Sequence, residues 1–245
     1  MTQPRNWKDK VRSVLPWKTY WFLKRIREEL RAFASKGDMT SLAKVYQTDK
    51  WGYHYYTPIY EKWFRLLRFK PVKLLEIGVG GYTKPQQGGD SLRMWKRYFP
   101  NGQITGIDLY EKSALQEDRI RIFQGDQSDA RFLRMVTETA GPFDIIVDDG
   151  SHMQSHIIAS FEALFPLMKP GGIYIIEDTQ TSYWPKFEGS TPDMKTIPSA
   201  MNYFIHRVHG VNRVEWRGEG QPTDIPDEGI DSISFYHNLI FITKK

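Results

Sequence analysis

Residues 143–152, FDIIVDDGSH, constrain the fold most, because a short apolar run leads directly into a cluster of polar groups. The apolar side chains at positions 143 and 145–147 predict a short buried strand. Buried parallel strands present their functional groups at their carboxyl ends. We therefore expect Asp148, Asp149 and His152 to lie at the rim of a crevice in a parallel sheet.

A second apolar run, residues 172–176, ends in the same way, on Glu177 and Asp178. Two neighbouring strands that both end on acids would bring three or four carboxylates together, and these repel one another strongly unless a cation lies among them. Surface loops are often acidic, so neither pair is informative alone. The two pairs together, with a histidine beside them, favour a metal-assisted active site.

The charge of the chain is distributed unevenly. The 245 residues, 40% of them hydrophobic, suit one large α/β domain with appendages. The 34 basic and 29 acidic residues give a net charge of +5, but residues 1–36 alone contain ten Lys/Arg and three Asp/Glu. The rest of the chain is therefore slightly acidic. Because enzymes of nucleic acids are usually basic around the site, we expect no nucleic-acid partner.

The absence of cysteine excludes disulfides and thiolate zinc sites. No apolar run is long enough to span a bilayer, and the N-terminus lacks the uninterrupted apolar core of a signal peptide. We therefore expect a cytoplasmic protein without a transmembrane segment.

The N-terminal part is expected to form a helical arm. Residues 6–35 are predicted to be largely helical beyond Pro16, with apolar side chains at three- and four-residue spacing on one face. Such a face packs on the body or on another subunit, which predicts a homo-oligomer; the alternative is peripheral contact with a membrane surface. Residues 49–64 are dense in aromatics and either cap a core or line a ligand pocket. We place the arm and this aromatic lid segment in residues 1–68.

The strand predicted at residues 72–78, VKLLEIG, is followed by a glycine-rich loop. Glycines let the backbone turn tightly and approach a ligand closely. The dinucleotide pattern GxGxxG is not met, because Thr83 stands where the third glycine belongs. The ExGxG pattern formed by Glu76, Gly78 and Gly80 is instead typical of methyltransferases that use S-adenosylmethionine.

Two further strand ends extend this candidate cofactor site. The strand predicted at residues 103–109 contains Asp108 near its end, where a carboxylate suits a ribose diol. The strand at residues 120–123 leads to Asp126 and Gln127, where such folds grip the adenine edge. Alternatively, Asp126 or Ser128 caps the helix predicted at residues 129–138. Asp148 completes the set of expected cofactor-binding residues.

The last third of the chain completes the predicted sheet. A helix at residues 153–168 and the strand ending at Glu177 precede a polar and aromatic loop, in which Tyr183 and Trp184 are candidate substrate-binding residues. A helix at residues 198–208 follows. Strands at residues 232–236 and 239–243 flank a two-residue turn and predict an antiparallel hairpin. We expect an α/β fold with a doubly wound, mostly parallel seven-stranded sheet in residues 69–245, as in class I methyltransferases.

The motifs EIGVGGY, GDQSD, DDGSH, PGGIYIIED and SYWP occur in the same order as in a known family. Over residues 40–245 the chain resembles the magnesium-dependent sugar O-methyltransferases of macrolide and related natural-product pathways. The resemblance implies S-adenosylmethionine as methyl donor and Mg²⁺ that grips a sugar or glycoside acceptor. By motif it implies Asp149, Glu177 and Asp178 as metal ligands and His152 as catalytic base. Those enzymes carry a larger N-terminal domain, absent from this sequence, so a different acceptor pocket and sugar are expected.

Three alternatives stay open at this point. A catechol-type O-methyltransferase also offers a metal two adjacent acceptor oxygens. A nicotinamide-dependent oxidoreductase is disfavoured by Thr83 and the terminal hairpin. A binding protein that has lost catalysis is disfavoured by the intact acids and histidine. On isolated grounds His152 would be a helix cap or a structural hydrogen-bonding group, but its place after DDGS favours the catalytic interpretation.

Overall fold

The computed structural model describes residues 16–190, 199–212 and 229–245. It divides into two compact units, Met1–Arg65 and Leu66–Lys245, whereas the sequence placed the boundary after residue 68. The start of the predicted arm and Pro198, the first residue of a predicted helix, lie outside the described residues. Within them, no helix combines the length and the apolar character needed to cross a membrane.

From residue 16 onward, where the structure describes it, the N-terminal unit is formed by α2 (Trp17–Ala34), α3 (Met39–Tyr46) and α4 (Thr57–Phe64). Asp38 caps α3 by accepting a hydrogen bond from Ser41 N at 2.8 Å. A second carboxylate, Glu61 on α4, accepts a hydrogen bond from Met39 N at 2.8 Å and ties α3 to α4. The predicted helix beyond Pro16 is thus present as α2, while its role as an arm stays a prediction.

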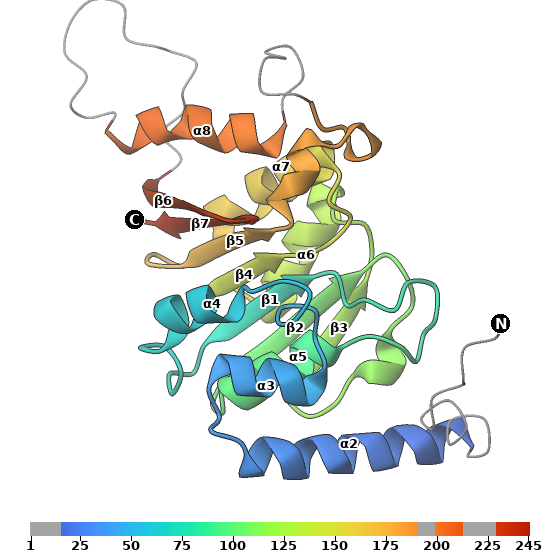
Figure 1. The fold of residues 1–245 in the computed structure, drawn as a ribbon. Coiled ribbons are helices and arrows are strands. Elements are labelled where there is room, and N and C mark those ends of the chain that lie inside the picture. Colours follow the sequence, from blue (N-terminus) through green and yellow to red (C-terminus); the bar gives the residue numbers. More distant parts are fainter. Residues whose placement is uncertain (1–15, 191–198, 213–228) are drawn as a thin grey trace, which may run out of the picture. The chain divides into compact units, whose positions relative to one another are not determined.

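The C-terminal unit is built on one seven-stranded sheet with the order β3-β2-β1-β4-β5-β7-β6, which Figure 1 shows from β3 to β6. The first five strands pair in parallel, and β7 and β6 are antiparallel. This confirms the predicted class I methyltransferase fold and its terminal hairpin. The strands are β1 (Lys73–Ile77), β2 (Gln103–Asp108), β3 (Ile120–Gln124), β4 (Ile145–Asp148), β5 (Ile173–Glu177), β6 (Ile230–Tyr236) and β7 (Leu239–Lys244).

The helices of this unit connect the strands. They are α5 (Asp90–Tyr98), α6 (Ala130–Ala140), α7 (Gln154–Leu164) and α8 (Ala200–Val211), with short 3₁₀ turns η1 (Ser113–Leu115), η2 (Phe165–Leu167), η3 (Thr179–Tyr183) and η4 (Pro185–Phe187). The alternative interpretation, in which Asp126 or Ser128 caps α6, was wrong. Asp129 accepts hydrogen bonds from Arg131 N and Phe132 N, because it directly precedes the helix. Asp126 instead binds the backbone and hydroxyl of Ser128.

One face of the sheet packs against α6, α7 and α8. Its apolar side chains include Leu75, Ile146, Tyr174 and Ile176, and they form one buried core with the helices. Strand residues alternate between faces, so Asp148, two residues after Ile146, also points towards this helical layer. The core therefore encloses a carboxylate directly beneath the strand end.

The order of the strands reverses at β1: β2 and β3 follow on one side of it, and β4 and β5 follow on the other side. Ligands of open α/β sheets bind at such a switch point, beyond the carboxyl ends of the strands. The two loops there touch: Asp149 N donates a hydrogen bond to Ile77 O at 3.0 Å. A Cβ atom on Gly78, which has φ +91°, would lie 2.1 Å from Asp149 O. The glycine at position 78 is therefore required for this close approach.

Replacing Ile146 by alanine tests the core that supports this edge. The side chain is fully buried in the central strand, so the free energy of unfolding should fall by about 2–5 kcal/mol in urea titrations. The same change at Ile205, which is half exposed on α8, should cost less than about 0.5 kcal/mol. Equal losses at both positions would contradict the described core.

Candidate active site

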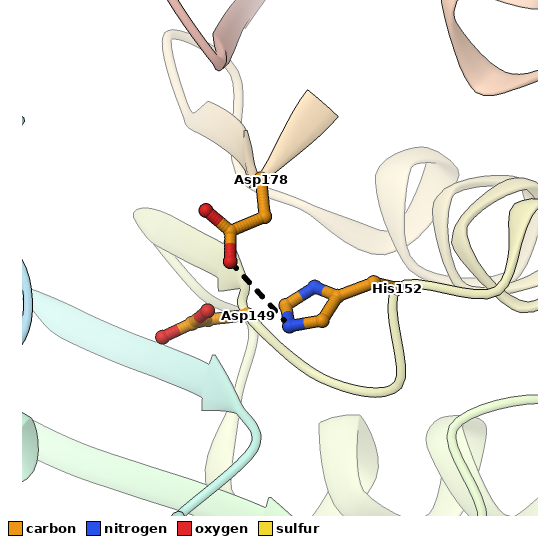
Figure 2. Close-up of side chains that lie close together, drawn as sticks. All are labelled: Asp149, His152 and Asp178. Atoms are coloured by element: carbon orange, nitrogen blue, oxygen red, sulfur yellow. Dashed lines mark ion pairs between the residues drawn. The ribbon is translucent and has the colours of Figure 1, made fainter. Parts of the chain in front are cut away.

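Three side chains from two loops meet at the carboxyl edge of the sheet. Asp149 and His152 follow β4, and Asp178 follows β5 (Figure 2). One ligand atom from each lies within 4.8 Å of the others. His152 Nε2 and Asp178 Oδ2 are 3.6 Å apart. They meet because β4 and β5 pair in parallel and therefore end side by side.

The backbone of this group is unusual. His152 and Asp178 have φ angles of 59° and 53°, in the left-handed region that residues other than glycine seldom adopt. Such conformations cost of order 1–3 kcal/mol and persist where surrounding contacts hold them. Their occurrence at the two residues whose side chains meet indicates that the surrounding structure holds both in place.

Glu177, the third predicted metal ligand, is the last residue of β5 and is buried. Within the described part of the chain, the group of close ligand atoms contains Asp149, His152 and Asp178 but not Glu177. The assignment of Glu177 as a ligand stays a prediction.

The donor atoms of this group suit a divalent cation. The two aspartates offer carboxylate oxygens, the ligands that Mg²⁺ prefers, and the partly buried position leaves access from solvent. With a soft thiolate excluded by the lack of cysteine, the residues present fit Mg²⁺ better than a structural zinc ion.

The glycine-rich loop after β1 lies beside the loop that carries Asp149, and a hydrogen bond to Asp108 at the end of β2 holds it in place. Asp108 Oδ2 accepts a hydrogen bond from Val79 N, and Asp108 Oδ1 accepts one from Tyr110 N, both at 2.9 Å. Glu76 is buried and accepts a hydrogen bond from Ser91 Oγ at 2.8 Å. The structure thus gathers Glu76, Gly78 and Asp108 around one loop, while their contacts with a cofactor stay predictions.

A buried lysine that the sequence analysis missed also shapes this loop. Lys112 is 1% exposed and donates hydrogen bonds to Lys84 O at 2.9 Å and Gln87 O at 3.1 Å. Burial lowers the pKa of Lys112, and the charge of Asp108 opposes this shift. The ammonium group thereby pulls the two ends of the 84–87 turn together.

Asp148 is the centre of a buried polar network below the strand end. Its carboxylate accepts hydrogen bonds from Ser160 Oγ at 2.9 Å, Gln127 Nε2 at 3.2 Å and Tyr174 Oη at 3.3 Å. Burial raises the pKa of Asp148 to about 6, and these donors and the charge of His152 act against the rise. Burial and the charge of Asp148 raise the pKa of Tyr174 well above its ordinary value.

Gln127 connects this network to the loop that carries Asp149 and His152. Its Oε1 accepts a hydrogen bond from Ser151 N at 2.7 Å, and a Cβ on Gly150 would lie 2.1 Å from the same oxygen. The side chains of Gln127 and Asp148 therefore support the loop from within. Their predicted contacts with a cofactor are not tested by this geometry, and neither is that of Asp126, whose carboxylate is bound to Ser128.

The segment after Asp178 places an aromatic side chain, Phe187, beside the ring of His152. Tyr183 and Trp184, the candidate substrate-binding residues, are 45% and 50% exposed after Asp178. Phe187 lies 6.2 Å from the His152 ring and 6.0 Å from the Trp184 ring, measured between ring centres. Phe187 was missed, and the aromatic density of the segment was its only sequence signal.

Ser160 and Gln154 were also missed, although the spacing contains a signal. The buried residues of α7 are Gln154, Ile157, Ser160, Phe161 and Leu164, which follow the helical repeat. A polar residue at a position of the buried face must find a polar partner. This indicates a buried polar contact, but it does not identify the partner.

Comparisons with known proteins agree with this geometry. The model of a methyltransferase domain family matches residues 75–179. "Mycinamicin VI 2''-O-methyltransferase" of Micromonospora griseorubida is 44% identical over 213 residues, which cover 85% of this chain and 53% of that protein. "8-demethyl-8-(2-methoxy-alpha-L-rhamnosyl)-tetracenomycin-C 3'-O-methyltransferase" of Streptomyces olivaceus is 48% identical over 218 residues, covering 88% and 56%. The chain spans about half the length of the curated relatives it matches.

Solved structures of the MycE methyltransferase from the mycinamycin biosynthetic pathway are similar in fold. A complex with Mg and SAH has a TM-score of 0.80 at 42% identity, covering 84% of this chain and 53% of that chain. A complex that also contains mycinamycin VI has a TM-score of 0.76 at 43% identity, covering 84% and 54%.

The sheet order, the glycine-rich loop after β1 and the acids after β4 and β5 define a class I methyltransferase domain. Within that class, the chain belongs to the macrocin/mycinamicin-type family of sugar O-methyltransferases.

Replacing Ser160 by alanine tests the network around Asp148. The change removes a buried donor, so the free energy of unfolding should fall by about 1–3 kcal/mol. Because the pKa of Asp148 is raised, its contribution to stability is greatest at low pH and is lost as pH rises through about 6. Ser160 favours the charged form, so the loss should be larger at pH 7.5 than at pH 4.5. Urea titrations at both pH values measure this; Ser113→Ala, in an exposed turn, is the control.

Proposed function

We propose that this chain transfers the methyl group of S-adenosylmethionine to a hydroxyl group of a sugar or glycoside, with Mg²⁺ bound beside the acceptor. The observation that carries the proposal is the group formed by Asp149, His152 and Asp178 directly beside the glycine-rich loop. A methyl donor and a metal-held acceptor need two such adjacent sites.

The names of the relatives support a sugar as acceptor. Both relatives are named for O-methylation of a natural product, and the MycE complex contains Mg, SAH and mycinamycin VI. Because this chain covers only about half of those proteins, the sugar and the position of its hydroxyl do not carry over. A catechol-type acceptor is the second candidate, since it also offers two adjacent oxygens to a metal.

We assign the metal-binding role to Asp149, Asp178 and the predicted third ligand Glu177. When bound, Mg²⁺ would lower the pKa of a coordinated hydroxyl and orient it. The two aspartate side chains supply the negative charge that attracts the ion. Their different strand ends allow them to approach it from two directions.

His152 is assigned as the general base. Its Nε2 atom faces Asp178 Oδ2 at 3.6 Å, so the imidazole lies next to the proposed acceptor position. After removal of the acceptor proton, the imidazolium would be stabilised by the Asp178 carboxylate. We assign substrate binding to Tyr183 and Trp184, whose exposed rings offer flat surfaces on which a sugar ring can pack, and add Phe187 beside His152.

The cofactor is assigned to the loop after β1. Glu76, Gly78 and Gly80 would approach the methionine and sugar parts, Asp108 the ribose, and the 126–127 turn the adenine. The proposed homo-oligomer, the cytoplasmic location and the role of residues 1–68 as arm and lid stay predictions, with a membrane-surface role of the arm as the alternative.

Methyl transfer from S-adenosylmethionine to glycosides with adjacent hydroxyls tests the proposal. Product should form with Mg²⁺, disappear with excess chelator and return when Mg²⁺ is restored. Asp149→Asn should abolish most Mg²⁺ binding in calorimetry and leave binding of S-adenosylhomocysteine intact, with the exposed Asp118→Asn as control. Full activity in excess chelator, or tight binding of NAD, would contradict it.

Replacing His152 by alanine tests the base. The rate should fall about 10²–10⁴-fold, the usual range for general-base catalysis, while Mg²⁺ and S-adenosylhomocysteine still bind. The control is His209→Ala on the exposed side of α8, which should keep full activity. If the metal alone activates the hydroxyl, His152→Ala will be nearly as fast as the wild type and the assignment fails.

A further inference from the structure

The side chain of Gln154 is buried and makes hydrogen bonds to the loop that contains His152 and to the segment that follows Asp178. It is the first residue of α7 and is 1% exposed. A side-chain amide has two N–H donors and an oxygen that accepts two hydrogen bonds. Gln154 makes all four of these hydrogen bonds, two as donor and two as acceptor, and together they fix the orientation of its side chain.

The two donors lead to the backbone of His152 and Asp178. Gln154 Nε2 donates to His152 O at 3.0 Å and to Thr181 Oγ1 at 3.3 Å. The Thr181 hydroxyl in turn donates to Asp178 O at 2.8 Å, and Thr181 N donates to the same carbonyl at 3.0 Å. One amide thus links the main chains of both residues whose side chains meet at 3.6 Å.

The residues at both ends of this link have the positive φ angles described above. Left-handed backbone conformations need surrounding contacts to persist, and a hydrogen bond to the carbonyl of such a residue supplies one. The link through Thr181 therefore holds the two loops in the conformation that makes the His152 and Asp178 side chains converge.

The oxygen of the same amide faces the following segment. Gln154 Oε1 accepts hydrogen bonds from Ser182 Oγ and from Ala200 N, both at 2.8 Å. Ala200 is the first residue of α8, whose N–H has no partner within its own helix. The amide oxygen of Gln154 thus joins η3, which contains Ser182, to the start of α8. Neither of these two hydrogen bonds involves the backbone of His152 or Asp178.

From this arrangement we propose that Gln154 is a positioning residue. Its donor side sets the geometry between the base His152 and the metal-binding Asp178, and its acceptor side anchors the segment that follows. The roles of His152 as base and Asp178 as metal ligand rest on the proposed function. The hydrogen bonds that join the two loops through Gln154 and Thr181 do not depend on it.

Three variants separate the two sides of the amide. Gln154→Met keeps the length of the side chain and removes all four hydrogen bonds. Thr181→Val keeps the shape of the side chain and removes the two hydrogen bonds of its hydroxyl group, from Gln154 Nε2 and to Asp178 O, while the bond from Gln154 to His152 O stays. Ser182→Ala is the matched control. It removes one hydrogen bond to Gln154 Oε1 and one from Met201 N, and it leaves the link between His152 and Asp178 intact.

Mg²⁺ calorimetry on protein saturated with S-adenosylhomocysteine is the first measurement. Supporting groups behind metal-binding residues typically contribute about 10–100-fold to metal affinity or activity. We expect Gln154→Met and Thr181→Val to weaken Mg²⁺ binding and lower kcat within that range, with unchanged affinity for S-adenosylhomocysteine. Ser182→Ala should change Mg²⁺ affinity by less than about twofold, because the link is intact.

The imidazole resonances of His152, recorded on ¹³C-histidine-labelled protein and assigned with His152→Ala, need neither metal nor turnover. They should shift in Gln154→Met and Thr181→Val and stay in place in Ser182→Ala. Lower melting temperatures with unchanged resonances and Mg²⁺ affinity would overturn the proposal, and so would equal effects of Ser182→Ala. If Gln154→Met does not fold, Thr181→Val decides. A wild type without methyl transfer would contradict the proposed function while these spectra still test the link.

Discussion

The parallel pairing of β4 with β1 on one side and β5 on the other is the constraint on which the site depends. It places three loops next to one another, and the contact between Gly78 and Asp149 O shows how closely two of them approach. A side chain larger than hydrogen at position 78 would separate the glycine-rich loop from the loop that carries Asp149 and His152. Under the proposed function, the methyl donor and the acceptor would then no longer be held within reach of each other.

Below this edge the fold encloses a carboxylate, which is costly unless it is hydrogen-bonded. Asp148 receives donors from Gln127 on the loop before α6, Ser160 on α7 and Tyr174 on β5. Because the buried carboxylate of Asp148 needs these hydrogen bonds, it constrains the relative positions of the loop before α6, α7 and β5. Because Gln127 also binds Ser151 N, this order extends to the loop that carries Asp149 and His152.

Strand positions were predictable because apolar runs of the right length leave few alternatives, and β4, β5 and the terminal hairpin were found within a few residues. The suggestion that Asp126 or Ser128 caps α6 was wrong. Both residues and Asp129 have side chains that can cap a helix, and the choice among them depends on where the helix begins. Asp148 was grouped with the cofactor residues by its place at a strand end. The two-residue alternation of the strand already indicated the opposite face from Asp149.

The sequence by itself determined the sheet, its reversed last strand, the glycine-rich loop and the acids that follow two strands, because local spacing and residue type carry that information. Only the tertiary structure decided that Asp149, His152 and Asp178 meet while Glu177 lies outside their group. It also decided which buried partners the side chains of Gln127 and Gln154 bind. The physical reason is that a polar side chain on a helix or loop has many potential partners, and long-range packing alone selects which of them lies within hydrogen-bonding distance.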